Sequence, residues 1–585
     1  MDNIFFSFTP SNFDAVQESF GYPEDLEIEE LATFKEKQDH LAEMEVGEAN
    51  PLISSQYGFH HQEDIAKKGA AYLLKGQRQH SQNPQPYRLT DLMLDAVSPQ
   101  TQPIQVSAGL ARIPETGPDF PEQDKQIPHP FSLASLKLLT DYGSGFKKLK
   151  GERLSGESTE STCVTSCRLS TEEIMRVAGG RYIQFRHQMY DDYYMPTHSF
   201  GFALPGDLSE DDKRDVELAH LLLAAAEKVG FQQYDRASRL LLHCEWISSA
   251  RGNPVQRVVY QFSEALRERI EKESGRVVHT KRGLEEKDDH QGLSRNHAYL
   301  TTYQQLPFPQ LLFFAGIQAI IENIASEHKI HLIDIGIRCG VHWTVLMQAL
   351  ADRQGCPIEL LKITAVGSTD SEETGKRLAD FAESLKLPFS FKSVLLSDMK
   401  DARKELFETE DDEAVIVYAP YILKTMISTP RSLENLMKVI RNLYPCIMVV
   451  IEVEANYNSP SFADRFIDAL FHFSAFYDSF EGCLKQYSED RIRMEAIFGE
   501  AIRNIVAEEG RERTVQSVTL DVWRAFFRRF RMVEIGMSEL SFMHASLVVK
   551  KFACRSSCTI DKKGKCLIVG WKGTPIHSLS IWKFH

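Results

Sequence analysis

The cysteines are the first side chains of this chain whose chemistry can be tested against their spacing. Structural zinc is held by four cysteine or histidine ligands, which come in closely spaced pairs. Cys554, Cys558 and Cys566 lie near the C-terminus, and Cys163 and Cys167 lie far upstream. Because the spacing is loose and the two groups lie in different regions, coincidence is favoured over a zinc site. We therefore predict no metal, and ten cysteines in 585 residues fit a reducing compartment.

A loop that follows a short apolar run offers a second kind of chemistry. It carries Asp334, Gly336 and Gly340, and an acid followed by spaced glycines is similar to the D-x-G-x-G-x-G loop with which Rossmann-like methyltransferases hold S-adenosylmethionine. However, Arg338 stands at the middle glycine position, where the cofactor must approach the backbone closely. The next strand ends at Gly367 without an acid for the ribose hydroxyls. Glycines at such turns also allow a tight bend from strand to helix, so we expect a vestigial loop and no cofactor.

Conventional catalytic and membrane signatures are missing from the sequence. There is no G-x-S-x-G, H-E-x-x-H or G-x-x-x-x-G-K-[ST] motif, so an enzyme is not predicted. No uninterrupted apolar stretch approaches the roughly 18 residues that a membrane span needs. The N-terminus carries an acid at Asp2 and no apolar h-region, so a secretory signal is not expected.

The alternation of helical and strand patterns predicts how these residues are positioned. Three amphipathic patterns joined by short turns predict a helical bundle over residues 208–273. From residue 330 on, short apolar runs alternate four times with helical patterns, which is typical of a doubly wound parallel sheet with right-handed crossovers. The tail from Met532 favours short strands at an antiparallel edge, including one at 546–553. The expected fold class is α/β.

The first 207 residues differ in composition from the rest of the chain. Residues 1–50 hold 13 acidic and two basic residues, a net charge of −11, interleaved with aromatic residues. Such segments are typical of solvated, partner-seeking arms of the activation-domain kind, and an acidic amphipathic helix packed on the body is the alternative. Residues 51–207 are rich in Gln, Ser, Pro and Gly, and predict a mostly disordered variable linker. Order is therefore expected to begin near Leu208.

A basic concentration near the C-terminus is a candidate nucleic-acid contact. Contacts to DNA phosphates need positive charge at suitable spacing. The arginines alternate with aromatic residues, and this pattern equally fits a helix that is packed on one side and solvated on the other, so both readings stay open. The candidate DNA-contact residues are Arg524, Arg528, Arg529 and Arg531.

The first helix of the bundle has a wider apolar surface than a single core contact needs. Its polar residues cluster within roughly 100° of the helical wheel and leave an apolar arc of about 220°. The surplus is covered either by neighbouring helices or by another molecule in a dimer contact, and the arc alone leaves both readings open. The residues of this candidate dimer face are Leu218, Leu221, Leu222, Ala225 and Val229.

The ordered part of the chain contains the strings AHLLLAAAEKVG from Ala219, IHLIDIGIRCGVHW from Ile330 and CLIVGWKG from Cys566. With these strings, the chain from residue 208 to 585 resembles, block by block, the GRAS family of plant transcriptional regulators. The strand with His331, Leu332, Ile333 and Asp334 is similar to the family's VHIID motif. The usual Gln-Gly-x-Gln-Trp string reads Cys-Gly-Val-His-Trp, and no D-E-L-L-A string occurs near the N-terminus, so gibberellin-receptor binding is not carried over and the subfamily stays open. The blocks are the helical cap with the first leucine-rich region (208–295), the VHIID block (296–370), the second leucine-rich region (371–405), the PFYRE region (413–510) and the SAW region (514–585).

The resemblance implies a helical cap over a Rossmann-like, methyltransferase-like core, without catalysis. It also implies a nuclear protein that regulates genes through DNA-binding transcription factors and other GRAS proteins, as a homo- or heterodimer, in plant development or in hormone or symbiosis signalling. DNA contact, direct or through a partner, stays open. The rival hypothesis is a methyltransferase that kept both the fold and S-adenosylmethionine, because a fold alone does not fix a function.

Overall fold

The computed structural model describes residues 133–143, 149, 168–190, 208–275, 289–367 and 371–585. All of them belong to one compact unit that spans residues 90–585. The predicted acidic arm of residues 1–50 lies outside the described residues, and so does most of the predicted linker. None of the helices in the described ranges is long and apolar enough to cross a membrane.

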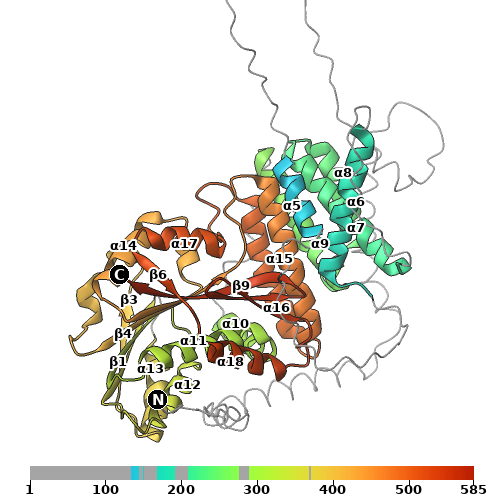
Figure 1. Ribbon diagram of the computed structural model, residues 1–585. Coiled ribbons are helices and arrows are strands. Elements are labelled where there is room, and N and C mark those ends of the chain that lie inside the picture. Colours follow the sequence, from blue (N-terminus) through green and yellow to red (C-terminus); the bar gives the residue numbers. More distant parts are fainter. Residues whose placement is uncertain (1–132, 144–148, 150–167, 191–207, 276–288, 368–370) are drawn as a thin grey trace, which may run out of the picture. The chain divides into compact units, whose positions relative to one another are not determined.

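The described strands form one mixed sheet (Figure 1). Their order is β3-β2-β1-β4-β5-β9-β8-β7, and β6 also pairs with β9. The first five strands run parallel, and the last four form an antiparallel edge. The strands are β1 (Lys329–Ile335), β2 (Leu360–Gly367), β3 (Phe389–Leu395), β4 (Ala414–Pro420), β5 (Ile447–Val453), β6 (Met532–Ile535), β7 (Cys558–Lys563), β8 (Cys566–Trp571) and β9 (Thr574–Phe584).

The central strands are buried because helices cover both faces of the sheet. β1 and β5 are buried along nearly their whole length, as expected for parallel strands between two helical layers. On one face, α14 (Pro430–Asn442) and α17 (Leu520–Arg528) form a core with alternate residues of β1 and β4. On the other face, α11 (Pro307–Asn323) approaches β5 closely at Gly316, where a Cβ atom would lie 3.5 Å from Val449. The predicted α/β, mostly parallel core is confirmed.

A second group of helices forms the cap beside this sheet (Figure 1). α15 (Phe462–Cys483) connects the two groups, because it contacts the cap helices α5, α6, α9 and α16 and also strands β8 and β9. The other cap helices are α5 (Leu133–Gly143), α6 (Thr171–Tyr190), α7 (Glu210–Gly230), α8 (Tyr234–Ile247), α9 (Pro254–Glu273), α10 (Asp289–Gln305) and α16 (Ser488–Ala507). The helices α12 (Trp343–Ala351), α13 (Glu372–Ser384) and α18 (Glu539–Lys550) belong to the sheet layers.

Two cap helices lie inside the segment that composition predicted to be linker. α6 packs against α7 and α15, and its side chains Ile174 and Tyr182 are buried there. In α5, the Tyr142 hydroxyl donates a buried hydrogen bond of 2.6 Å to Asp468 of α15. The linker prediction is therefore wrong for these two helices, because their apolar residues recur at helical spacing within an otherwise polar stretch. The rest of that segment lies outside the described residues.

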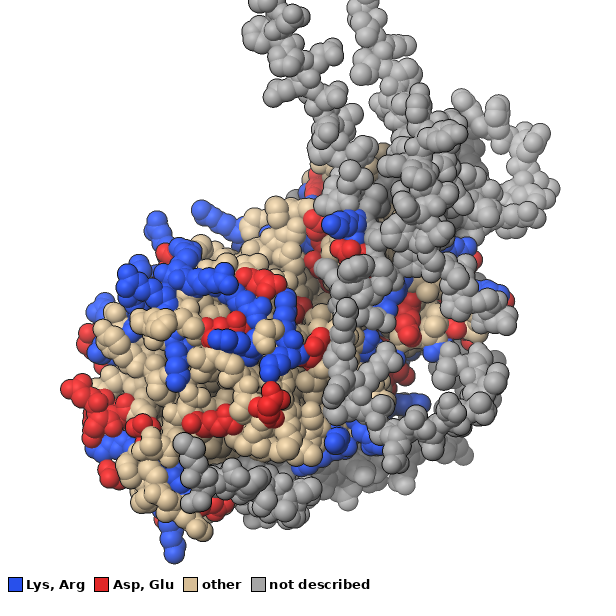
Figure 2. Space-filling model, in the orientation of Figure 1, with Lys and Arg blue, Asp and Glu red and all other residues tan. Residues whose placement is uncertain are grey.

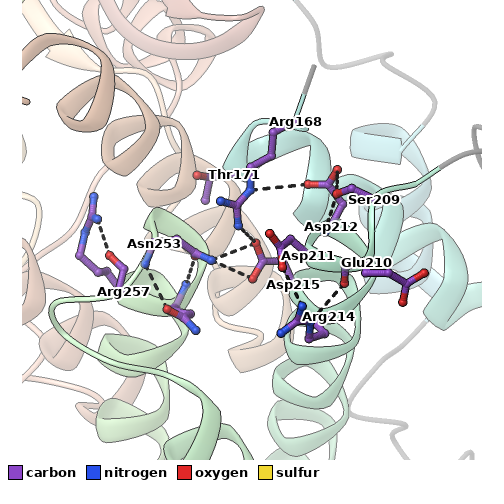
Figure 3. A network of polar contacts seen from close by, with 12 residues as sticks. Arg168, Thr171, Ser209, Glu210, Asp211, Asp212, Arg214, Asp215, Asn253 and Arg257 are labelled. Carbon is purple, nitrogen blue, oxygen red and sulfur yellow. Dashed lines mark hydrogen bonds and ion pairs between the residues drawn. The ribbon is translucent and has the colours of Figure 1, made fainter. Parts of the chain in front are cut away.

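A polar network fixes the residues before α6 to the starts of α7 and α9 (Figure 3). Arg168 forms ion pairs with Asp215 at 2.9 Å and with Asp212 at 3.8 Å. The amide of Asn253, which caps α9, donates to both carboxylate oxygens of Asp215 at 3.0 and 3.1 Å. Ser209 caps α7 by accepting the backbone N–H of Asp212. Because three segments converge on Asp215, the entry to α6 is part of the cap.

The strand predicted at 546–553 is wrong, because most of this segment is the end of α18. This helix begins after Ser538, whose side chain accepts the backbone N–H of Ser541. It packs against α11 and buries Val548 and Val549. β-Branched residues favour strands only weakly, so helix packing overrides that preference here.

Ile174→Ala should lower the free energy of unfolding by about 2–5 kcal/mol, because Ile174 is fully buried and its truncation leaves a cavity in the cap. Urea denaturation followed by circular dichroism measures this change. Arg181→Ala, at an exposed position of the same helix, should change it by less than about 0.5 kcal/mol. Equally small effects from the two substitutions would show that α6 is not part of the folded core.

Candidate functional site

The VHIID motif lies on β1, in the middle of the parallel strands, and its side chains are buried. His331 Nδ1 lies 3.0 Å from Glu413 Oε2, and its Nε2 lies 2.8 Å from Thr364 Oγ1. Because a carboxylate only accepts hydrogen bonds, Nδ1–H donates to Glu413 and the Thr364 hydroxyl donates to Nε2. Burial lowers the pKa of His331 to about 4, so the ring is neutral. Leu332 and Ile333 are also buried, and the motif is thus an internal part of the sheet.

Asp334 ends the motif with a fully buried carboxyl group. Trp343 Nε1 donates a hydrogen bond of 2.8 Å to its Oδ2. Its Oδ1 has no hydrogen-bond partner among the described residues. Burial raises the pKa of Asp334 to about 7, and the bond from Trp343 opposes this rise. The carboxyl group is therefore divided between its neutral and charged forms near neutral pH.

Aromatic rings fill the space around Asp334. The His342 ring stacks on Phe313 of α11 with 4.6 Å between ring centroids. Trp343, at the start of α12, meets Tyr418 of β4 edge to face at 4.8 Å. Trp343 and Tyr418 are fully buried, and burial lowers the pKa of His342 to about 3, which keeps its ring neutral. Side chains from α11, α12 and β4 thus fill the space at the carboxyl end of β1.

The loop between β1 and α12 does not fit S-adenosylmethionine. Gly336 and Gly340 have positive φ angles of 99° and 68°, and a Cβ atom on Gly340 would lie 2.9 Å from Thr374 of α13. These glycines therefore serve the bend and a close helix contact. Arg338, which we expected to obstruct the cofactor, is exposed and lies over the ring of Tyr299. The obstruction comes instead from the buried aromatic rings, which surround the carboxyl group of Asp334 at the end of β1.

A second buried polar group lies at the carboxyl end of β5. The backbone N–H of Lys424 donates a bond of 3.1 Å to Glu452 Oε1, and burial raises the pKa of Glu452 to about 7. Burial also lowers the pKa of Lys424. Tyr421 and His577 pack with 5.1 Å between their rings; burial raises the pKa of the first and lowers that of the second, so both are neutral. The four side chains are thus a carboxyl group and an amine whose pKa values burial shifts in opposite directions, beside a neutral phenol and a neutral imidazole.

The apolar face of α7 that we expected to make a dimer contact lies inside the cap. Its five residues are at most 1% exposed, and α6, α8 and α9 pack around the helix. The dimer face prediction is therefore wrong for this helix. A sequence shows the width of an apolar arc, but it does not show which neighbour covers that arc. The buried residues are Leu218, Leu221, Leu222, Ala225 and Val229.

An exposed apolar patch lies on the neighbouring helix α8. Trp246 is 83% exposed, and Leu242 and Ile247 are 47% and 38% exposed. The opposite face of the helix packs on α7 and α9 and buries Leu240 and Leu241. We call Leu242, Trp246 and Ile247 the α8 apolar patch. The sequence analysis did not identify this patch. The pattern that could have indicated it is the presence of apolar residues on more than one side of a short helix.

Arg524 differs from the other three candidate DNA-contact arginines. Glu534 accepts hydrogen bonds of 2.8 and 3.0 Å from its guanidinium, and Asp521 accepts one of 2.9 Å. Its side chain is only 15% exposed. Arg524 therefore joins α17 to β6 through internal ion pairs, and a role as a phosphate contact is wrong for this residue.

The remaining arginines belong to a basic face over α14 and α17. Figure 2 shows lysine and arginine side chains gathered where these two helices lie in Figure 1. Arg529 links the helices through an ion pair of 2.9 Å with Glu434 and is still 63% exposed. Positive side chains held on two adjacent helices are suited to phosphate groups. The exposed residues of this basic face are Arg431, Lys438, Arg528, Arg529 and Arg531.

The described cysteines considered for zinc do not belong to any group of three or more possible metal ligands. Cys558 and Cys566 are buried on β7 and β8, and Cys554 lies in the turns before them. In the part of the chain that the structure describes, no three His, Cys, Asp or Glu side chains are grouped as metal ligands. Cys163 and Cys167 lie outside that part.

Comparison with known proteins identifies relatives of this architecture. The GRAS domain family matches residues 218–583. The DELLA protein RGL1 of Arabidopsis thaliana is 30% identical over 382 residues, which are 64% of this chain and 71% of that protein. The DELLA protein GAI1 of Vitis vinifera is 28% identical over 397 residues, 66% of this chain and 65% of that protein. The crystal structure of SCL7 in Oryza sativa shares the fold, with a TM-score of 0.56, 23% identity and coverage of 63% of this chain and 99% of that one.

Asp334→Asn should weaken the pH dependence of stability. Burial raises the folded-state pKa of Asp334 above its ordinary value, so the stability it contributes at low pH is lost as the pH rises from about 4 through 7. The asparagine variant cannot lose a proton and still offers an acceptor to Trp343. Urea unfolding should therefore show the variant gaining about 3 kcal/mol relative to the unsubstituted chain between pH 5 and pH 8. Asp352→Asn, at the exposed carboxylate that follows the last residue of α12, should show no such gain.

Calorimetric titration of the full chain with S-adenosylmethionine should give no binding heat. The buried rings of Trp343 and Tyr418 pack around the Asp334 carboxyl group, and the cofactor would have to displace them. A methyltransferase titrated in parallel supplies the positive control. A micromolar dissociation constant for this chain would contradict the expectation and favour the rival methyltransferase hypothesis.

Proposed function

Because the chain belongs to the GRAS domain family, a family of plant transcriptional regulators, we propose that it is a nuclear regulator without catalytic activity. It acts through protein–protein contacts with DNA-binding transcription factors and with other GRAS proteins, in plant development or in hormone or symbiosis signalling. The packing around Asp334 supports this proposal over the alternative of an S-adenosylmethionine-dependent methyltransferase, since the chain's own rings occupy the edge where such enzymes bind their cofactor.

The α8 apolar patch is the observation that carries the proposal. Large apolar side chains that are exposed together mark surfaces that bind other proteins. Tryptophan is also enriched among the residues that contribute most to binding energy at interfaces. With Trp246 83% exposed at its centre, the patch offers an anchor that a partner can bury. The partner that we propose is a second GRAS chain, so that the expected dimer contact moves from α7 to α8.

The basic face over α14 and α17 supports a second contact, with DNA. It presents Arg528 and Arg531 beside Arg529, without Arg524, which is held by internal ion pairs. Phosphate contacts are sequence-independent, and this face therefore supplies affinity rather than a choice of target sequence. Selection of target genes is then left to the DNA-binding partner.

Trp246→Asp and Leu242→Asp should each weaken self-association at least about tenfold while the chain stays folded, because a partner would have to bury an unpaired carboxylate. Light scattering over a concentration series measures association, circular dichroism reports folding, and a reporter gene in plant cells should lose regulated output in parallel. Tyr444→Asp is the matched control, since Tyr444 is 80% exposed and lies beyond the end of α14, outside the cap. Unchanged association in both α8 variants would remove this patch from the interface.

A further inference from the structure

Two cysteines that are distant in the sequence meet at the end of α15. Cys483 is the last residue of this helix, and Cys554 lies in the turns between α18 and β7. The Cys483 thiol donates to the Cys554 sulfur with 2.9 Å between the two sulfur atoms, and both residues are half-buried. Among the described cysteines, this is the one pair whose sulfur atoms are in hydrogen-bond contact.

The residues around the two cysteines form a packed junction between the end of α15 and the end of β8. Asp478, one turn before the end of α15, accepts a bond of 2.6 Å from Trp571 Nε1 and pairs with Lys572 at 2.8 Å. A Cβ atom on Gly482 would lie 3.4 Å from the Trp571 ring, so the last turn of α15 is in close contact with the end of β8. Cys558, the nearest other cysteine along the chain, is fully buried in β7. The contact between the thiols thus belongs to a tightly packed junction.

The two thiols differ in reactivity. The pKa of Cys554 is lowered because its sulfur accepts the hydrogen bond from Cys483. The pKa of Cys483 is raised because it donates this bond and because it is partly buried. Burial also raises the pKa of Cys558. Since the thiolate is the nucleophile, Cys554 is suited to react first and Cys483 to resolve the product.

We propose that Cys483 and Cys554 form a redox dithiol that a hydroperoxide, ROOH, converts into an intramolecular disulfide. The Cys554 thiolate attacks the terminal oxygen, the O–O bond breaks, and ROH leaves after protonation, so that Cys554 becomes a sulfenic acid. The Cys483 sulfur then attacks the Cys554 sulfur, the S–O bond breaks, and water leaves. Two thiols and one ROOH thus give one disulfide, ROH and water, and two electrons pass from sulfur to oxygen.

The disulfide would join the cap to the antiparallel edge of the sheet. α15 packs against five other cap helices, whereas Cys554 lies directly before β7. Linking two residues that are 71 positions apart restricts the unfolded chain, and a junction that is already packed needs little movement to be linked. This proposal goes beyond the proposed function and depends on neither the α8 apolar patch nor the basic face.

Peptide mapping of the full chain tests the proposal. The reduced protein is freed from reductant, exposed to one equivalent of hydrogen peroxide, alkylated, and digested without reduction. Mass spectrometry should find the Cys483 peptide disulfide-linked to the Cys554 peptide, with two free thiols lost per chain. The thermal midpoint should rise on oxidation and return after treatment with dithiothreitol.

Substitutions distinguish a specific disulfide between Cys483 and Cys554 from unspecific oxidation of the other cysteines. Cys483→Ser and Cys554→Ser should each abolish the linked peptide, whereas Cys339→Ser, which removes an exposed cysteine of the β1–α12 loop, should retain it. The wild-type map is decisive without any variant. Oxidation of Cys339 with no Cys483–Cys554 link would overturn the proposal. A link from Cys483 to Cys558 in its place, or a lower thermal midpoint in the oxidised chain, would overturn it as well.

Discussion

The hydrogen bond from Trp343 to the buried carboxyl group of Asp334 ties the start of α12 to the carboxyl end of β1. Asp334 lies at the carboxyl end of a central parallel strand, which is where doubly wound folds bind their ligands. Here Trp343, the first residue of α12, donates a hydrogen bond to the Asp334 carboxyl group and also packs against Tyr418. The helix start, the polar partner and the aromatic packing therefore depend on one side chain. An edge that serves chemistry in other proteins has become part of the core.

The surfaces that we propose for partner contacts are the outer faces of helices whose inner faces are buried. α17 illustrates this division, because Trp523 and Phe527 pack into the sheet core while Arg528 and Arg529 are exposed. α8 shows the same division with apolar residues on both sides. Its inner face completes the cap, and its outer face carries Trp246. Neither surface needs a cleft, which fits contacts with macromolecules better than it fits a small-molecule site.

The sequence predicted those elements that are marked by a local pattern of apolar residues. It failed where the structure depends on packing between elements that are distant in the chain. The short apolar runs predicted the parallel strands, because burial on both faces leaves a continuous apolar signal. α6 was missed because the average composition of a long polar segment concealed the helical spacing of Ile174, Ala178 and Tyr182. α18 was mistaken for a strand because its valines favour that state only weakly. The apolar arc on α7 is visible in the sequence, but its burial among α6, α8, α9 and α15 depends on tertiary packing.

The cysteines show that sequence spacing also fails to predict which reactive side chains come into contact. Spacing along the chain groups Cys554 with Cys558 and Cys566, and on that basis the only candidate was a metal site. Tertiary packing instead places Cys554 beside Cys483, because the last turn of α15 lies against Trp571 at the end of β8. No spacing rule connects residues that are 71 positions apart. Where a helix end and a strand end meet, reactive side chains become partners through packing, and the pair is visible only once the sheet and the cap are assembled around it.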